Sequence, residues 1–240
     1  MRILTGIRPT GRLHLGHLVG QIGPLLELQH RCECYLEIAD WHALTTGRFD
    51  PGVMRRRVLE VALDWIAPGL DPEKNVFFVQ SEVPEHAELH LLFTMLTRVA
   101  RVERCPTYKE KSAELAQPDH QGPPQPDHPR SDNASLGLLS YPVLQAADIL
   151  IYRADAVPAG EDQLPHLELC RETARRFNRT FGQTFPEPEP ILSNAPRLPG
   201  IDGQMKMSKS RGNTIDLAHH PEEIRERVMS MVTDPRKIHR

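Results

Sequence analysis

The first twenty residues, MRILTGIRPTGRLHLGHLVG, place an apolar run, a glycine-containing turn and a helical pattern one directly after the other. The apolar run covers 3–7 and the turn covers 8–11, and apolar residues then recur at spacings of three and four from Leu15 to Ile22. A strand, a turn and a helix in this order form the unit of parallel α/β sheets. Ligands bind such sheets beside the carboxyl ends of the strands, where helix N-termini attract anions.

Two histidines, His14 and His17, lie three residues apart at the predicted start of this helix, so they share one of its faces. Gly16 between them leaves room for a ligand. The spacing alone fits equally well with two surface histidines on an ordinary first helix. The sequence Lys-Met-Ser-Lys-Ser at 206–210 favours a functional role, because it brings a second chemical motif to the far end of the same α/β chain.

The rest of the chain repeats the order of strand and then helix, which predicts the α/β class with a doubly wound parallel sheet. Val76 to Val79 form a continuous apolar run, which predicts a strand buried on both faces, as parallel strands usually are. Gly23-Pro24 predicts a kink or a break in the first helix. The other predicted strands are 34–38 and 156–158, and the other predicted helices begin at Asp50-Pro51, after Pro84, at 141–154, at 161–181 and at Pro221.

Three segments carry more specific expectations. Residues 183–190 are rich in Pro and Glu and are predicted to be a connector. The helix after Pro84 is expected to have an apolar side, and the last helix is expected to bury three residues. The first of these sides consists of Leu89, Leu92, Phe93, Leu96 and Val99, and the second of Ile224, Val228 and Met231.

Composition restricts the class of protein. The chain has 240 residues, of which 39% are hydrophobic and 25% charged, so one globular core of ordinary size is expected. No apolar run approaches the ~18 residues of a membrane span, and the N-terminus lacks a signal-peptide pattern, so a cytoplasmic location is expected. The four cysteines show no C-x-x-C spacing and are predicted to be reduced thiols. A net charge of −3 argues against a surface that binds nucleic acid as a whole.

The segment 117–133, QPDHQGPPQPDHPRSDN, differs from the rest of the chain. It contains five prolines and no apolar anchor, so it cannot pack a core, and a mobile surface loop is expected. Its two histidines offer metal ligands, but the composition favours a solvated loop. No metal site is assigned from the sequence.

The helix predicted at 141–154 carries a stripe of three polar residues, Tyr141, Gln145 and Asp148. A surface helix would show the same stripe. Here, however, the other positions are apolar nearly all round the helix, which indicates burial. A polar stripe on a buried helix has to face a partner or a cavity.

These motifs resemble those of a known family. His-x-Gly-His at 14–17 and Lys-Met-Ser-Lys-Ser at 206–210 resemble the two signatures of class I aminoacyl-tRNA synthetases, which have a Rossmann-like catalytic domain. Within this class the chain is most similar to the tryptophanyl-tRNA synthetases. The segments that carry this similarity are GIRPTGRLHLGH (6–17), ADWHALTT (39–46), YKEKS (108–112), YPVLQAADILIY (141–152), GEDQ (160–163) and KMSKS (206–210).

The resemblance implies a ligase that activates L-tryptophan with ATP, releases pyrophosphate and transfers the amino acid to the 3′ end of tRNA(Trp). No enzyme nucleophile is needed, because catalysis consists of alignment and of charge stabilisation on the polyphosphate. Mg²⁺ is expected to accompany ATP without a protein cage of its own. The implied catalytic residues are His14, His17, Lys206 and Lys209.

The resemblance also implies which residues bind the substrates. Asp148 would accept the indole N–H of tryptophan, which is a donor only. The implied tryptophan-binding residues are Arg8, Tyr141, Gln145, Asp148 and Gln163. The implied ATP-binding residues are Arg8, Pro9, Thr10, Gly16, His17, Lys111, Gly160, Glu161, Asp162, Leu198, Lys206, Met207, Ser208, Lys209 and Ser210. Two of these assignments have simpler alternatives, since Lys111 fits a solvated charge run and the acids at 161–162 fit an ordinary first helical turn.

The expected organisation is a single catalytic domain over 1–240, with a helical connective insertion at 84–139 and the lysine-containing loop at 196–211. Residues 220–240 are expected to begin the linker to an anticodon-binding domain, most of which is absent from this chain. The resemblance implies a homodimer that pairs through the helices of the insertion. The alternatives are a tyrosine-specific enzyme, an adenylating paralogue that does not use tRNA, and a non-catalytic paralogue that binds RNA or protein.

Overall fold

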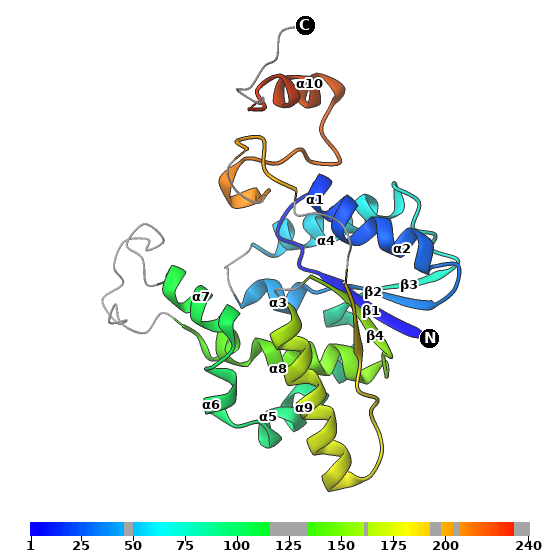
Figure 1. The fold of residues 1–240 in the computed structure, drawn as a ribbon, viewed down its shortest axis with the longest axis vertical. Coiled ribbons are helices and arrows are strands. Elements are labelled where there is room, and N and C mark those ends of the chain that lie inside the picture. Colours follow the sequence, from blue (N-terminus) through cyan, green and yellow to red (C-terminus); the bar gives the residue numbers. More distant parts are fainter. Residues whose placement is uncertain (46–49, 116–133, 161–162, 193–197, 204–206, 233–240) are drawn as a thin grey trace, which may run out of the picture.

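The computed structural model describes residues 1–45, 50–115, 134–160, 163–192, 198–203 and 207–232. Five parallel strands form one sheet in the order β3-β2-β1-β4-β5 (Figure 1). The strand order reverses beside β1, as in a doubly wound sheet. The strands are β1 Arg2–Ile7, β2 Glu33–Ile38, β3 Asn75–Val79, β4 Ala156–Ala159 and β5 Glu189–Leu192.

Helices connect these strands and cover both faces of the sheet (Figure 1). The α-helices are α1 Leu15–His17, α2 Gly23–Leu28, α3 Asp40–Leu44, α4 Pro51–Ile66, α5 Glu85–Leu96, α6 Val99–Val102, α7 Pro106–Leu115, α8 Leu136–Ile151, α9 Leu164–Phe181 and α10 Pro221–Met229. Two short 3₁₀ turns are η2 Gln80–Glu82 and η5 Lys209–Arg211, and η1 Leu18–Ile22 is a π-helical segment. Among the described helices, none is both long and apolar enough to cross a membrane.

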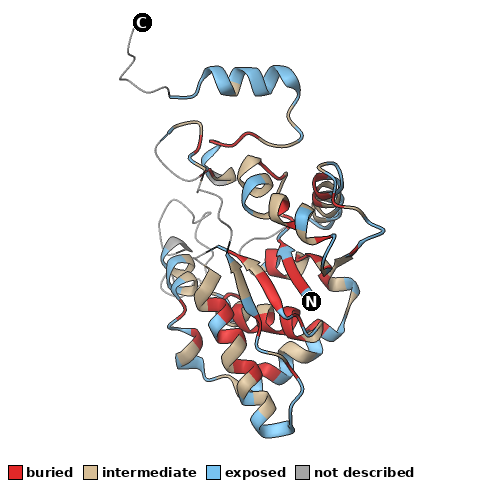
Figure 2. Cartoon of the chain, turned by 45° about the vertical axis from the view of Figure 1, so that its right-hand side comes forward, coloured by how far each residue is buried: buried red, intermediate tan, exposed pale blue. Residues whose placement is uncertain are grey.

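Each face of the sheet has its own hydrophobic core. Phe93, Leu150 and Leu167 belong to the core between the sheet and α5, α8 and α9. Leu25 and Trp65 belong to the core on the opposite face, under α2 and α4. Figure 2 shows buried residues in red where the helices meet the strands. The predicted doubly wound parallel sheet is therefore confirmed.

Most of the predicted elements are present, with corrections at the sheet edges. β3 was expected to be buried on both faces, but Val76 is 45% exposed because β3 is an edge strand. β5 lies partly in the segment predicted to be a connector, and Val157 of β4 pairs with its Pro190. A proline is tolerated there because β5 is the other edge, where one side of the strand makes no ladder hydrogen bonds.

The first helical segment continues past the predicted interruption. A π-helical turn joins α1 to α2, and Pro24 lies in the first turn of α2. Proline is accepted at that position because the first amides of a helix have no intrahelical partner. The predicted kink or break is therefore replaced by a π-helical segment that joins the two helices.

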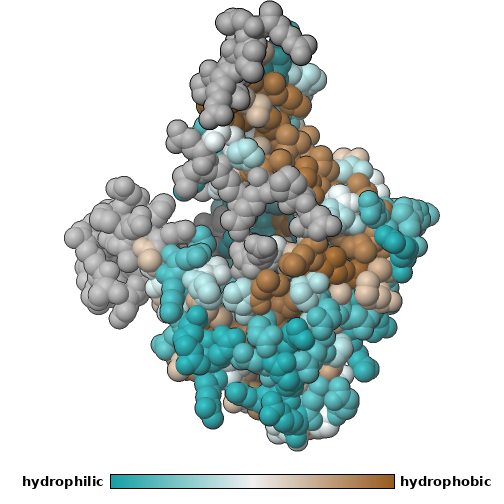
Figure 3. Space-filling model, viewed as in Figure 1, coloured by the Kyte–Doolittle hydropathy of each residue, from teal (hydrophilic) through white to brown (hydrophobic). Residues whose placement is uncertain are grey.

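The apolar side predicted for the last helix is not buried among the described residues. α10 has no buried residue, and Ile224, Val228 and Met231 are 36%, 48% and 38% exposed. α10 projects away from the sheet in Figure 1, and Figure 3 shows apolar surface around it. On α5, the helix after Pro84, Leu92 is likewise exposed rather than packed, and so is Val99, which was predicted to lie on the same helix but belongs to α6. Helical periodicity identifies an apolar stripe, but it does not say what covers that stripe.

The four cysteines are free thiols, as predicted, and three of them are buried. The helix at 141–154 begins earlier than expected, at Leu136, and includes Pro142. The predicted loop at 117–133 lies outside the described residues, as do 161–162 and 204–206.

Candidate functional site

The candidate site lies where the parallel strands end. β1 pairs with β2 on one side and β4 on the other, so the segments after Ile7 and Ala159 leave the same edge of the sheet. Helices begin close to these ends, and in doubly wound sheets the crevice at such a reversal of strand order is the usual ligand site. The motif at 6–17 begins at the end of β1, and Gly160 directly follows the end of β4.

The two N-terminal histidines are tied into the start of α1. The Gly16 amide donates to His14 Nδ1 at 3.1 Å, and the His14 amide donates to His17 Nδ1 at 3.2 Å. The ring centroids lie 4.0 Å apart, and His14 is only 7% exposed. His14 is therefore not an ordinary surface histidine. Because each Nδ1 accepts an amide, the neutral rings carry their proton on Nε2, which can donate to an anion.

Glycine is needed at position 16 because the His14 ring lies against it. A Cβ there would lie 2.9 Å from two atoms of the His14 ring. The missing side chain at Gly16 therefore lets His14 cap the helix.

The C-terminal signature meets the N-terminal one directly. Lys209 Nζ donates to the carbonyl oxygen of Gly11 at 2.7 Å, and Gly11 has a φ of +131°, a conformation that favours glycine. The segment after the lysine loop runs antiparallel to the start of α1, with a bridge between His14 and Asp216. Burial lowers the pKa of Lys209 to about 8, against the opposing effect of two acidic side chains, Asp216 and Asp64. The fold thus brings together two motifs nearly two hundred residues apart.

The described part of the lysine loop is held by backbone and side-chain hydrogen bonds. Met207 is buried, and its amide donates to the Leu198 carbonyl at 3.1 Å. The Ser208 amide donates to Asn213 Oδ1 at 2.8 Å, and Asn213 Nδ2 donates to Asp202 at 2.9 Å. The sequence analysis did not single out Asn213. Lys206 and the side chain of Ser210 lie outside the described residues.

Asp148 lies at the centre of a buried polar network. Its side chain is 2% exposed, and Oδ2 lies 2.7 Å from His42 Nε2. Oδ1 accepts from Gln80 Nε2 at 2.9 Å and lies 2.7 Å from His86 Nδ1. His86 Nε2 lies 2.8 Å from the Tyr152 hydroxyl. Asp148 is therefore fixed by side chains from three separate elements, α3, η2 and α5.

The network leaves Asp148 able to accept one more donor. Burial acts to raise the pKa of Asp148, but His42 and His86 outweigh it and the pKa is lowered. An ionised carboxylate offers about four acceptor sites. Three are used here, two on Oδ1 and one on Oδ2. The remaining site on Oδ2 can receive a single N–H or O–H group.

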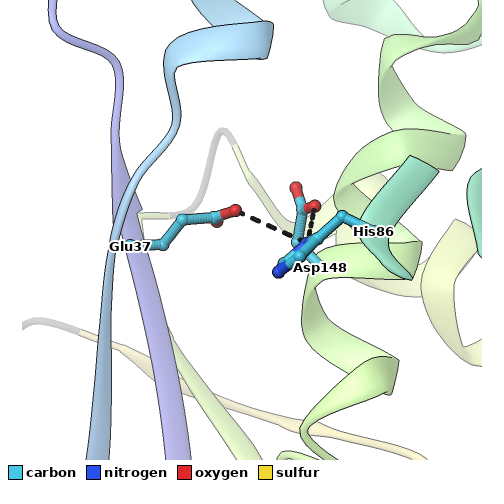
Figure 4. Close-up of side chains that lie close together, drawn as sticks. All are labelled: Glu37, His86 and Asp148. Carbon is cyan, nitrogen blue, oxygen red and sulfur yellow. Dashed lines mark hydrogen bonds and ion pairs between the residues drawn. The ribbon is translucent and has the colours of Figure 1, made fainter. Parts of the chain in front are cut away.

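Glu37 of β2 faces the same cluster, as Figure 4 shows. It is 2% exposed, and its Oε1 lies 3.8 Å from His86 Nδ1. Burial raises the pKa of Glu37 well above its usual range, and the charges of Asp148 and Asp40 add to this effect. A Cβ at Gly6 would lie 2.9 Å from Glu37 Oε2, so glycine on β1 makes room for the carboxyl group.

Glu37, His86 and Asp148 also have the donor types of a metal site. However, His86 Nδ1 and Asp148 Oδ1 are separated by 2.7 Å, a hydrogen-bond distance. Two ligands of one tetrahedral Zn²⁺ would lie roughly 3.3 Å apart, given bonds of about 2.0 Å. The geometry therefore fits a hydrogen-bonded network better than a coordinated ion.

Two of the other residues predicted to bind tryptophan lie on the same helix as Asp148. Tyr141 and Gln145 are half-buried on α8, as the polar stripe predicts. The Tyr141 hydroxyl lies 3.1 Å from His166 Nε2, and burial raises the pKa of Tyr141 to about 12. Gln163 precedes α9, and its amide donates to the Gly160 carbonyl at 2.9 Å. Glu161 and Asp162, predicted to lie near ATP, are outside the described residues.

Of the remaining predicted ATP-binding residues, three follow β1 and one lies on α7. Arg8 is exposed, Pro9 is buried, and the Thr10 amide donates to the Arg8 carbonyl at 2.8 Å. Lys111 is on α7, which Figure 1 shows at the left.

Three residues of the network were missed as site residues by the sequence analysis. His42 and Gln80 come shortly after β2 and β3, and His86 follows on α5. Polar residues directly after predicted strands were the available signal, because parallel strands end at one edge.

Comparison with known proteins places these motifs in context. The family profile described as "tRNA synthetases class I (W and Y)" matches residues 1–240. The tryptophan–tRNA ligase of Thermotoga maritima is 51% identical over 241 residues, which cover 100% of this chain and 69% of that protein.

Two solved structures show the same fold. The tryptophanyl-tRNA synthetase of Campylobacter jejuni, solved with ADP and tryptophan, has a TM-score of 0.85 and 36% identity. The match covers 98% of this chain and 68% of that one. The tyrosyl-tRNA synthetase of Archaeoglobus fulgidus, solved with L-tyrosine, has a TM-score of 0.75 and 25% identity, covering 97% of this chain and 66% of that one.

Proposed function

Because the chain belongs to the class I tRNA synthetases for tryptophan and tyrosine, we propose that it activates L-tryptophan with ATP and transfers it to the 3′ end of tRNA(Trp). The relatives named tryptophan–tRNA ligase support this choice, since they match nearly the whole chain at up to 51% identity. The observation that carries the proposal is the contact between Lys209 and Gly11, which joins the two signatures at the ligand edge of the sheet.

In the first reaction, a carboxylate oxygen of tryptophan attacks the α-phosphorus of ATP. A bond forms between that oxygen and phosphorus, the bond to the β-phosphate bridging oxygen breaks, and pyrophosphate leaves with the electron pair. The chain's contribution is to align the two substrates and to stabilise the charge on the phosphates. His14 and His17 donate from Nε2, and Lys209 moves from the Gly11 carbonyl to the phosphates. Lys206 is proposed to act with Lys209.

In the second reaction, a hydroxyl group of the terminal tRNA ribose attacks the activated carbonyl and AMP leaves. This step is proposed from the family relationship, together with the tRNA acceptor end as a partner. A location in the cytoplasm and a homodimer through the helices of 84–139 are further proposals on the same basis.

Asp148 is proposed to select tryptophan. Its one remaining acceptor site on Oδ2 matches the single N–H donor of the indole ring, and Tyr141 and Gln145 lie on the same side of α8. Phenylalanine would leave this site unpaired, and such losses cost about 10⁴-fold or more in comparable sites. Tyrosine is the alternative substrate, because a phenol hydroxyl can also donate and a tyrosyl-tRNA synthetase shares the fold.

Mg²⁺ is proposed to enter with ATP and to be held by phosphate oxygens and water. Asp64, a carboxylate at the phosphate end, is already engaged by Arg12 and the Leu13 amide. This fits a cation held mainly by the nucleotide, which would neutralise part of the phosphate charge when bound.

Pyrophosphate exchange tests the proposal. The chain is assayed for ATP–pyrophosphate exchange with tryptophan, tyrosine and phenylalanine, and for charging of tRNA(Trp). Exchange that depends on tryptophan supports the assignment. Exchange with tyrosine alone would move the chain to the tyrosine branch, and no exchange with any amino acid would overturn the adenylating function.

A further inference from the structure

A carboxylate outside both signatures holds the turn between β1 and α1. Asp64 lies on α4, and its side chain is 3% exposed. Oδ2 accepts the Leu13 amide at 2.7 Å, and Oδ1 lies 2.7 Å from Arg12 Nη2. One side chain of α4 thus fixes two consecutive residues of the turn.

These two residues lie between the two proposed catalytic contacts. Gly11, whose carbonyl accepts Lys209, directly precedes Arg12, and His14 directly follows Leu13. The Leu13 carbonyl also accepts the Leu217 amide at 2.8 Å, so the residue is tied to α4 on one side and to the segment after the lysine loop on the other. A movement of this turn would displace both contacts at once.

Stability alone gives a weak reason for a carboxylate at this position. Burial raises the pKa of Asp64, and the Leu13 amide and the charge of Arg12 oppose that rise. Buried ion pairs often add little net stability compared with apolar residues of similar volume, because both charges lose their water. The main consequence of Asp64 is therefore the geometry it imposes on the turn.

We propose that Asp64 is a positioning residue for adenylate formation, which fixes the β1–α1 turn so that the Lys209 contact and the His14 ring face the same phosphates. The inference rests on the proposed function of the chain as an adenylating enzyme. It adds a residue from α4 to a site otherwise built from the two signatures and the strand ends.

Asp64 also contributes to the charge around Lys209. The groups that act on the Lys209 ammonium are Asp216 and Asp64, which raise its pKa, and Arg57 and Arg8, which lower it. Removal of the Asp64 charge should therefore lower the pKa of Lys209 further. This shift depends on the charge of Asp64, so it separates the effect of the charge from that of the hydrogen bond to the Leu13 amide.

Three variants of α4 test the proposal in pyrophosphate exchange. Asp64→Ala removes both contacts, and Asp64→Asn keeps an oxygen for the Leu13 amide but loses the charge. Glu60→Gln is the matched control, because it removes a charge from the same helix, where Glu60 pairs with the exposed Arg56 at 3.7 Å. Asp64→Ala is expected to lower kcat/KM for ATP about 10–100-fold, as for misplaced catalytic groups, with KM for tryptophan within about twofold.

Asp64→Asn should recover part of this loss and shift the alkaline limb of kcat/KM for ATP to lower pH. Activity of both Asp64 variants equal to that of Glu60→Gln would overturn the proposal. So would equal rises in KM for ATP and KM for tryptophan without a pH shift, because that pattern indicates general destabilisation of the site.

A second measurement does not require activity. NMR of ¹³C-methylated lysines reports the pKa of Lys209 in the wild-type chain and in both substitutions. A lower pKa in Asp64→Asn, but not in Glu60→Gln, supports the role of Asp64 even if tryptophan fails to support exchange. An unchanged pKa, with the wild type active, overturns the inference and leaves the proposed function intact.

Discussion

The tryptophan end and the phosphate end of the proposed site are held together in different ways. Asp148 is 1% exposed and accepts hydrogen bonds from side chains on three elements. Lys209 is only half-buried, and its ammonium reaches a backbone carbonyl of another loop. Water can replace the lysine contact when it breaks, whereas a partner lost from the buried network leaves polar groups unpaired.

This difference matches what each end has to do. Discrimination between amino acids benefits from a rigid acceptor, because leaving that acceptor unpaired is costly. Catalysis benefits from contacts that strengthen only in the transition state, and a loop can make and release such contacts. Under the proposed function, selection of the amino acid depends on the folded core, and phosphate activation depends on the contact between Lys209 and the turn after β1.

Asp148→Asn should have the largest effect, since it breaks the rigid end. The amide nitrogen of asparagine would face one of the three donors, Gln80, His42 and His86. The substitution would also remove the negative charge that these side chains surround. We expect kcat/KM for tryptophan to fall about 10²–10³-fold, with a lower Tm. Pyrophosphate exchange and thermal unfolding measure both. Asp155→Asn, an exposed carboxylate just before β4, is the control, and unchanged kcat/KM for tryptophan in Asp148→Asn would refute the assignment.

Lys209→Ala should separate the two ends cleanly. The loss of one donor to a developing phosphate charge lowers kcat about 10²-fold in comparable sites, so a similar decrease is expected. KM for tryptophan and Tm should remain close to the wild-type values, because Asp148 and its partners are untouched. Lys74→Ala, at a surface lysine paired with Asp71, is the control. Loss of tryptophan binding with normal kcat would contradict the separation.

The sequence predicts the two signatures and Asp148, but it does not predict the side chains that hold Asp148. The polar stripe of α8 identifies Asp148, because the helix is apolar nearly all round and a buried acid needs a partner. His42, Gln80 and His86 could not be assigned as its partners, since they follow different strands. Their proximity depends on strand order, which local patterns do not contain.

The same reasoning explains the errors at the edges of the fold. β5 has four residues and includes Pro190, so it lacks the length and the apolar character by which strands are recognised. The exposed side of α10 shows the opposite problem. Its periodicity correctly predicts a helix, but Ile224 and Val228 remain partly exposed because burial depends on neighbours outside the local pattern.

The pH dependence of activity should sharpen the contrast, because the two ends titrate differently. Lys209 has a pKa of about 8 in the free protein, so its ammonium is lost as pH rises through that value. We expect kcat/KM for ATP, which reports the free enzyme, to fall about tenfold for each pH unit above about 8. Bound phosphates should raise the pKa of Lys209, so the alkaline decrease in kcat should occur at higher pH. A flat profile of kcat/KM from pH 7 to 10 would contradict the role of Lys209.

The smallest effect is expected from Glu37→Gln, which removes a titratable proton beside the buried network without removing a hydrogen bond to Asp148. The pKa of Glu37 is raised by burial and by Asp148, so the folded chain keeps a proton that the unfolded chain releases above about 4.5. The contribution of Glu37 to the free energy of unfolding is fully present below about pH 4.5 and falls as pH rises. It is lost once pH passes the pKa of Glu37 in the folded chain. Glutamine has no proton to lose, so the Tm advantage of the variant should grow from pH 4 to pH 9.

The expected difference is a few degrees, because about 1 kcal/mol corresponds to about 2–4 °C in a domain of this size. Glu33→Gln on the same strand provides a control of opposite sign. The pKa of Glu33 is lowered by hydrogen bonds from Tyr35 and Arg2, so its substitution should give no advantage that grows with pH. If Glu37→Gln and the wild type show parallel Tm profiles across this range, Glu37 is ionised in the folded chain. The buried network would then carry two adjacent negative charges, and the rigidity assigned to the tryptophan end would need another source.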